Sequence, residues 1–353
     1  MRILGIETSC DETAASVVEN GSHLLSNVVA SSIALHAVYG GVVPEIAARS
    51  HIEAIIPVID QALADANCTW SQLDGIAVTN GPGLGGSLLI GLLTARTIAI
   101  CQNLPLYAIN HVEGHVYANF LTQTSLPGYS LPDQQPLFPM LALIVSGGHT
   151  QLVLFHSHFD YTLLGQTHDD AMGEAFDKVA KILGLAYPGG PSIGLKAKEG
   201  DPFSYNLPKA RLTKKYDFSF SGLKTAVLRL AQEQIGESFG FPSSKLSERL
   251  NEAQKANIAA SFQRIAVETV VDKTITAFNE YLPASVVIAG GVAASSELRR
   301  QLAERLPVAI AYTDPKLCTD NGAMIATLGC YQAKLHQTPA DPYKLEVLPD
   351  LNM

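Results

Sequence analysis

One order of apolar strands and helices occurs twice along the chain, and this repetition restricts the possible folds more than any other feature. The first copy predicts strands at 3–8, 14–19 and 24–30, a helix at 44–65, a strand at 75–79, a helix at 88–101 and a strand at 106–109. Short β-branched or apolar runs between turn residues are typical of strands. Pro44 suits the first turn of the helix that it opens.

The second copy predicts strands at 140–145, 151–155 and 161–166, a helix at 171–183, helical segments at 224–234 and 252–281, a strand at 286–289, a helix at 297–305, a strand at 308–311 and a helix at 321–335. An irregular Gly/Pro-rich insertion at 187–221 interrupts it. Two such copies predict an α/β protein with the duplicated actin, sugar-kinase and Hsp70-like (ribonuclease H-like) fold, in which two lobes face each other across a nucleotide cleft. Element order supports a fold and says nothing of chemistry.

The Pro-rich, polar stretch 123–139 is the best candidate for a linker between the lobes. We therefore expect a first lobe at 1–135, with a metal-binding helix at 111–115. We expect a second lobe at 136–353, with a basic insertion at 187–250. The last helix is expected to pack back toward the first lobe.

The composition is that of a packed globular protein, with 47% hydrophobic and 16% charged residues. No run of 18 or more apolar residues occurs, so we expect no membrane span. The start MRILGIETSC lacks the regions of a secretory signal. The five cysteines are odd in number and form no CxxC pair, which favours free thiols in a reducing compartment. Together these features predict a cytoplasmic protein.

The net charge of −9 argues against a protein that coats nucleic acid generally, but the charge is uneven. Between Lys196 and Arg229 lie eight basic residues and three acidic ones. Such a patch suits the phosphates of a structured RNA. A solvated surface insertion explains the charge equally well.

A polar turn, Glu7 to Thr13, joins the first two predicted strands and carries two adjacent carboxylates, Asp11 and Glu12. A hairpin turn can be polar for solubility alone. At a cleft, either carboxylate could accept a proton or bind a metal-linked water.

The matching turn of the second copy reads Ser146-Gly147-Gly148-His149-Thr150. Two glycines let backbone N–H groups approach a phosphate, and the hydroxyls add donors. A later Gly290-Gly291 junction between a strand and a helix, followed by Ser295, would let adenine and ribose lie against the backbone. An ordinary turn would also explain each segment alone. The interpretation as a nucleotide site therefore depends on where each segment lies in the repeated order of elements.

His111 and His115 are four residues apart, a spacing that places two imidazoles on one face of a helix. Asp320 precedes the last predicted helix and could complete a metal site or cap that helix. Two nitrogens and a carboxylate suit Zn²⁺ or Fe²⁺ and leave coordination positions open. The zinc-protease motif HExxH is excluded because Val112 stands where its glutamate belongs.

These segments together resemble the bacterial tRNA threonylcarbamoyladenosine transferase family, formerly labelled O-sialoglycoprotein endopeptidase or glycoprotease. The resemblance runs in order from Ile3 to about Gly329 and is carried by GIETSCDET, VVPEIAARSH, NGPGLGGSLLIGL, NHVEGHVYA, IVSGGHTQLVL, GEAFDKVAKILGLAYPGGP, DFSFSGLKTAV, IAGGVAASSELR and CTDNGAMIA. It implies transfer of the threonylcarbamoyl group from threonylcarbamoyl-adenylate to the N6 amine of adenosine 37, beside the anticodon, in tRNAs that read codons starting with A. The product is N6-threonylcarbamoyladenosine, and AMP leaves.

The resemblance also implies roles for particular residues. His111, His115 and Asp320 would hold one divalent ion, Fe²⁺ as the first expectation and Zn²⁺ as its rival, with Mg²⁺ as a companion of bound nucleotide. The adenylate would bind at Ile144, Val145, Ser146, Gly147, Gly148, Asp177, Gly190 and Ser295. The family usually has Asn where this chain has Ser295, which puts that contact in doubt. Asp11 and Glu12 are our candidates for the proton acceptor.

The partners that the resemblance implies are the anticodon stem-loop of tRNA, an adenylate-forming synthase, a non-catalytic paralogue and a small ATPase, with no membrane involved. Two other classes fit the fold alone: a sugar- or acetate-kinase-like phosphotransferase and a nucleotide-gated scaffold like Hsp70 or actin. Neither class requires the two histidines and the aspartate, so this set disfavours both.

Overall fold

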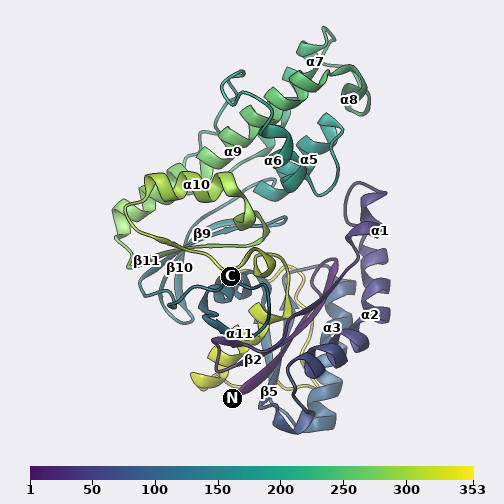
Figure 1. Cartoon of the computed structure of the whole chain (residues 1–353), viewed down its shortest axis with the longest axis vertical. Coiled ribbons are helices and arrows are strands. Elements are labelled where there is room, and N and C mark those ends of the chain that lie inside the picture. Colours follow the sequence, from purple (N-terminus) through teal and green to yellow (C-terminus); the bar gives the residue numbers. More distant parts are fainter. The chain divides into compact units, whose positions relative to one another are not determined.

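The computed structural model describes residues 1–353, which form two compact units (Figure 1). The first unit comprises Met1–Pro136 and Ala311–Met353, and the second comprises Leu137–Ile310. The first boundary lies within the expected linker. The chain end differs from the expectation of a second lobe at 136–353, because residues from Ala311 onward form part of the first unit.

The first unit contains a seven-stranded sheet in the order β6-β5-β1-β2-β3-β7, with β4 also paired to β2. The strands are β1 (Arg2–Glu7), β2 (Glu12–Glu19), β3 (His23–Leu24), β4 (Val28–Ser31), β5 (Gly75–Gly81), β6 (Leu106–Asn110) and β7 (Gln123–Thr124). β1 runs antiparallel to β2 and parallel to β5, which runs parallel to β6. The expected strand at 24–30 is thus two short strands.

The second unit contains a five-stranded sheet in the order β10-β9-β8-β11-β12. The strands are β8 (Met140–Val145), β9 (Thr150–Ser157), β10 (Asp160–Gln166), β11 (Ser285–Ala289) and β12 (Ile310–Ala311). β8 runs antiparallel to β9 and parallel to β11. The pairing of β8 with β9 and β11 therefore repeats that of β1 with β2 and β5. This repetition confirms the duplicated sheet that the element order predicted.

The helices of the first unit are α1 (Ile33–Ala37), α2 (Pro44–Asp65), α3 (Gly85–Gln102), α4 (His111–Tyr117) and α11 (Gly322–Lys334). α2 and α3 lie side by side and cover one face of the sheet, where Leu4, Ile6 and Val17 join the buried core (Figure 1). α3 is long and apolar enough to cross a membrane by length and composition alone. It packs against β5 and α2, and one such helix is weak evidence for a membrane span.

The helices of the second unit are α5 (Met172–Leu183), α6 (Gly189–Ala197), α7 (Ser221–Gln234), α8 (Leu246–Arg249), α9 (Glu252–Tyr281) and α10 (Ser296–Arg305). The Gly/Pro-rich stretch at 187–221 was expected to be irregular, yet α6 lies within it. Pro188 and two glycines open this helix, and α6 is held by packing against α5 and α9 rather than by its own propensity.

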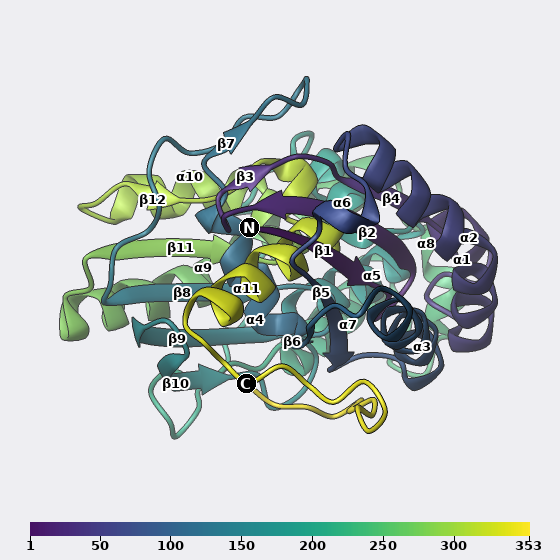
Figure 2. The same ribbon diagram turned by 90° about the horizontal axis from the view of Figure 1, so that it is seen from below.

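α11 lies on the opposite face of the first sheet, against β1 and β2 (Figure 2). Residues Gly322–Tyr331 are buried on all sides, as expected of a helix with no polar face. The approach is very close: a Cβ on Gly5 would lie 2.2 Å from the Gly322 carbonyl oxygen and 2.4 Å from the Ala326 nitrogen. A glycine in β1 therefore sets how deeply the helix sits on the sheet.

The C-terminal segment crosses the first unit after α11. The Ala340 amide donates to the Leu106 carbonyl, and the Arg96 guanidinium donates to the carbonyls of Pro342 and Tyr343. Further along the segment come Leu348 N to Asn80 O (2.7 Å), Gly83 N to Pro349 O (3.1 Å) and Asn110 Nδ2 to Asn352 O (3.2 Å). Hydrogen bonds of its backbone, with other backbone groups and with two side chains, thus fix a segment that has little secondary structure of its own.

The Gly5→Ala substitution should destabilise the chain by about 3 kcal/mol, because the new methyl group overlaps backbone atoms of α11 that cannot move aside. Gly41→Ala is the matched control, since a Cβ at Gly41 meets no atom within 4 Å. Urea unfolding of both variants measures the difference. Equal midpoints for the two would show that α11 does not pack this closely.

Candidate metal centre

Both histidines lie on α4, a short helix that begins directly where β6 ends. The side chain of Asn110 caps it and accepts hydrogen bonds from the amides of Val112 (2.9 Å) and Glu113 (3.2 Å). Such a cap satisfies amides that a helix start leaves without partners. Every residue of α4 is buried, so its orientation is fixed by packing on all sides. His111 and His115 then project from one side, with ring centroids 4.7 Å apart.

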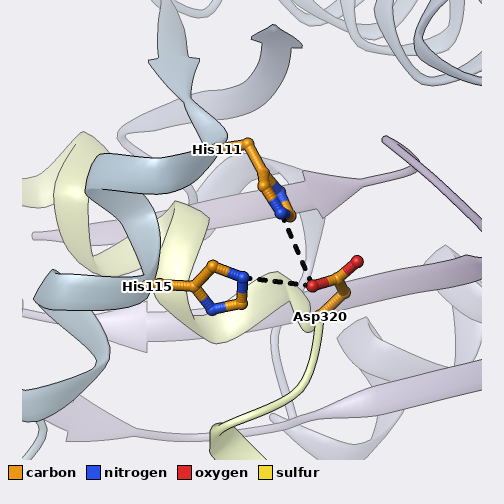
Figure 3. Close-up of side chains that lie close together, drawn as sticks. All are labelled: His111, His115 and Asp320. Carbon is orange, nitrogen blue, oxygen red and sulfur yellow. Dashed lines mark ion pairs between the residues drawn. The ribbon is translucent and has the colours of Figure 1, made fainter. Parts of the chain in front are cut away.

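Asp320 reaches the same point from the turn before α11 (Figure 3). Its Oδ1 lies 3.5 Å from Nε2 of His111 and 3.2 Å from Nε2 of His115. Asn321, rather than Asp320, caps α11, by accepting a hydrogen bond from the Met324 amide. The alternative of Asp320 as a helix cap is therefore wrong, and its carboxylate faces the two imidazoles.

The arrangement of the three side chains is better explained by a shared cation than by hydrogen bonds among them. Their ligand atoms all lie within 4.8 Å of one another. Nδ1 of His115 has no partner, and Nε2 makes no hydrogen bond despite its contact with Asp320, although the residue is 2% exposed. Buried polar atoms without partners are rare and need an explanation. Two imidazole nitrogens and one carboxylate oxygen match the ligand preferences of Fe²⁺ and Zn²⁺ and leave positions open for other ligands.

Glu7 fixes the orientation of His111 from behind. This fully buried carboxylate lies 3.1 Å from Nδ1 of His111 and also accepts hydrogen bonds from the Ser9 amide and the Thr79 hydroxyl. When this carboxylate accepts a hydrogen bond from Nδ1–H, the Nε2 lone pair of His111 is directed at the candidate ion position. Carboxylates in this place orient metal-binding histidines in many proteins. Sequence reasoning assigned no role to Glu7, although a charge at the end of an apolar strand signals a buried partner.

The electrostatics of the site favour positive charge. Burial alone would lower the pKa of His111, but the carboxylates of Glu7 and Asp320 outweigh it and raise that pKa to about 9. Burial alone would raise the pKa of Glu7, and the charge and hydrogen bond of His111 outweigh it and lower that pKa. A bound cation would take the place of the imidazolium proton, so ion and proton compete for this position.

Asp11 and Glu12 lie near this centre but are not among its converging ligand atoms. Oε1 of Glu12 accepts a hydrogen bond from Ser31 (2.9 Å), while its Oε2 is buried without a partner. Burial raises the pKa of Glu12 to about 7, helped by the negative charges of Asp11 and Asp320. The pKa of Asp11 is also raised, mainly by burial. A carboxyl group that titrates near neutrality is suited to proton transfer.

The residues expected to bind the adenylate lie in the second unit, where glycines follow two adjacent strands. Ser146 follows β8, and Gly290 follows β11, its parallel neighbour; a Cβ on Gly290 would lie 2.5 Å from the Val145 carbonyl oxygen. The carboxyl ends of adjacent parallel strands are a common ligand site. Gly147 and Gly148 face open space, so a ligand can approach their backbone. The side chains of Ile144 and Val145 are fully buried, which leaves only their backbone for a ligand.

Asp177 and Gly190 are brought together as well. Oδ1 of Asp177 accepts a hydrogen bond from the Gly189 amide (2.7 Å), so this carboxylate ties α5 to the start of α6. Gly190 itself faces open space. Gly173, which sequence reasoning passed over, packs its backbone against Ser146 and Gly147. Ser295 caps α10 by accepting from the Leu298 amide (3.4 Å), a structural role that competes with nucleotide binding.

Replacement of Glu7 by Gln should weaken Zn²⁺ binding by about 10- to 100-fold, because it removes the charge that orients His111. Glu113→Gln is the control. Glu113 is a buried acid on α4, the helix of the two histidines, and its oxygens are not among the converging ligand atoms. Isothermal titration with the metal measures both. The assignment fails if the two variants bind Zn²⁺ equally well.

Most of the chain matches a known protein family. Residues 23–327 match the family model described as tRNA N6-adenosine threonylcarbamoyltransferase. Proteins of that name from Thermomicrobium roseum and Dehalococcoides mccartyi strain BAV1 are 51% and 46% identical, over 95% and 100% of this chain and 92% and 99% of their own.

A solved structure of full-length HypF in its phosphate- and nucleotide-bound form has a TM-score of 0.53. It is 12% identical, over 95% of this chain and 46% of that one, so the likeness shows the fold alone. With the repeated sheets, it confirms the duplicated actin-like fold class. The cleft between the lobes stays a prediction.

Proposed function

Since the chain belongs to the tRNA N6-adenosine threonylcarbamoyltransferase family, we propose that it transfers the threonylcarbamoyl group of threonylcarbamoyl-adenylate to the N6 amine of adenosine 37, with release of AMP. The observation that carries this proposal is the convergence of His111, His115 and Asp320 in a chain of that family. We propose Fe²⁺ as the ion, with Zn²⁺ as the alternative, and the cytoplasm as the compartment.

The donor is a mixed anhydride of a carbamic and a phosphoric acid, so it is activated before it binds. The amine nitrogen attacks the carbamoyl carbon, the new N–C bond forms, and the bond from that carbon to the phosphate oxygen breaks. AMP leaves with the electron pair. No protein nucleophile is needed, and the residues have only to orient the donor and accept one proton.

In this proposal, residues of the chain both orient the donor and accept the proton. A divalent ion at the His111, His115 and Asp320 site would orient the donor and polarise its carbonyl group. The backbone amides of Gly147 and Gly148, with the Ser146 hydroxyl, would hold the phosphate. Glu12 would take the amine proton on its buried Oε2.

The Glu12→Gln substitution should lower kcat at pH 8 by about 100-fold, the usual contribution of a general base. In the unsubstituted chain kcat should rise as pH passes about 7 and level off above it, because only the ionised carboxylate accepts a proton. Since the fold favours neutral Glu12, the Gln variant should fold at least as well at pH 8, which thermal melting checks. A pH profile that is the same in both proteins would remove Glu12 from this role.

The reaction itself is tested with labelled threonylcarbamoyl-adenylate and unmodified tRNA, in the presence of the proposed synthase, paralogue and ATPase. Label should appear in the tRNA and should be lost with His115→Ala. A chain that instead phosphorylates a small molecule with MgATP, independently of tRNA, would be a phosphotransferase. No transfer with all partners present would count against the proposal.

We further propose that the non-catalytic paralogue docks on the outward face of α2 and α3. Ile52 and Ile56 on α2 are 61% and 54% exposed, and Leu89 and Leu93 on α3 are 43% and 46% exposed. Each pair is four residues apart and so shares one helix face. Apolar strips on two adjacent helices suit a helical partner with a similar face.

A single Ile56→Glu substitution should therefore weaken complex formation with the paralogue at least 10-fold, by placing a charge in the apolar contact. Glu53→Gln, one turn of α2 earlier and exposed, is the control with a change of one charge. Analytical ultracentrifugation of each variant with the paralogue gives the affinity. Unchanged association of Ile56→Glu would place the interface elsewhere.

A further inference from the structure

The basic segment from Lys196 to Arg229 is only partly available to an external ligand. Four of its eight cations are neutralised within the chain: Lys196 by Glu199 and Glu252, Lys209 by Glu268 and Asp272, Lys215 by Glu280, and Lys224 by Asp170. The other four, Lys198, Arg211, Lys214 and Arg229, have no acidic partner within 4.0 Å. Of the basic segment that was expected to bind phosphates, only these four residues therefore remain available to an external ligand.

Arg229 lines an open groove of about 730 Å³ between α7 and the loop that includes Tyr205 and Asn206. α7 presents the polar residues Ser221, Thr225, Arg229 and Glu233 to the groove, and Gly222, Ala226 and Leu230 line it beside them. The opposite side of the helix, with Leu223, Val227 and Ala231, is buried in the unit. α7 is thus amphipathic, and its polar stripe faces a surface depression large enough for a ligand.

Aromatic side chains adjoin the groove at two places. Phe239 is 70% exposed, and the guanidinium of Arg229 lies 5.6 Å from its ring centroid. Phe203 is 74% exposed, directly precedes a groove residue, and has Arg264 at 4.7 Å. Single exposed apolar residues are common, but two exposed rings that each lie against an arginine and adjoin one groove are not explained by packing.

This combination is the chemistry of unpaired RNA. Unstacked bases bind to aromatic and guanidinium planes, phosphates bind to arginine, and hydroxyl or carboxylate groups pair with base edges. Ser221 and Thr225 supply hydroxyls, and Glu233 can accept a hydrogen bond from a base amino group. An acidic peptide would use the cations but would leave both rings without a role.

We propose that this groove binds unpaired nucleotides of the tRNA substrate, with Arg229 on a phosphate and Phe239 stacked on a base. The proposal rests on the proposed function only in taking tRNA as the substrate. It adds a binding surface in the second unit that consists of residues outside the metal centre and outside the predicted adenylate site.

The test is the affinity for a fluorescent, unmodified tRNA transcript, measured by anisotropy at several salt concentrations with the full chain, alone and with its proposed partners. Arg229→Gln should weaken binding about 10-fold and reduce the slope of log K against log salt by about one. Phe239→Leu should weaken it about 5- to 100-fold with an unchanged slope, and Phe239→Tyr should retain binding. The two residues therefore have different signatures.

Lys215→Gln is the matched control, because it removes the same charge from the same segment but from a lysine already paired with Glu280. It should change the affinity less than twofold. The proposal is overturned if the tRNA affinities of Arg229→Gln and Phe239→Leu also stay within twofold of that of the unsubstituted chain. It is also overturned if the unsubstituted chain binds no tRNA, either alone or with its proposed partners.

Transfer assays separate this proposal from the function on which it rests. With groove variants the KM for tRNA should rise while kcat at saturating tRNA is retained. If the groove variants lose tRNA affinity while the unsubstituted chain binds tRNA but transfers no label, the groove proposal is supported and the proposed reaction is overturned. If both variants transfer label normally with an unchanged KM for tRNA, the proposed reaction is supported and the groove proposal is overturned.

Discussion

The metal centre depends on the close contact between α11 and the sheet of the first unit. Asp320 precedes this helix, so its carboxylate reaches His111 and His115 only if the helix lies deep against β1 and β2. Glycines permit that depth: a Cβ on Gly322 would lie 2.5 Å from the Ser16 amide nitrogen, and one on Gly329 would lie 2.5 Å from the Ala77 Cβ. Close packing thus brings together side chains that are about 200 residues apart in sequence.

A second constraint is electrical. The buried carboxylate of Glu7 and the partly buried carboxylate of Asp320 both lie against His111, and an arrangement of this kind is costly unless positive charge balances it. A protonated imidazole can supply the charge in the absence of an ion, which the raised pKa of His111 reflects. Burial raises the pKa of Glu12, and the negative charge of Asp320 adds to that rise. The ion site and the candidate proton acceptor are therefore coupled through charge as well as through position in the chain.

Much of the fold was predictable because periodicity and turn residues are local. The helix at Pro44–Asp65 and the long helix at Glu252–Tyr281 have the predicted bounds, and the repeated sheet order follows from the repeated element order. α6 was missed because its opening glycines and proline suggest a loop, and only packing against α5 and α9 makes it a helix. Likewise, charge counting could not show that Lys215 is already paired with Glu280, since the partner lies 65 residues away.

The sequence by itself determined the fold class, the family resemblance and the residue types of a metal site, because these follow from local pattern and from side-chain chemistry. Only the tertiary structure decided that Ala311–Met353 joins the first unit, that Asn321 rather than Asp320 caps α11, and that Glu7 orients His111. It also decided that Arg229 lines the α7 groove, whereas Lys215 is paired with Glu280. Each of these depends on contacts between distant segments, and such contacts are set by packing depth and burial, which a local pattern does not contain.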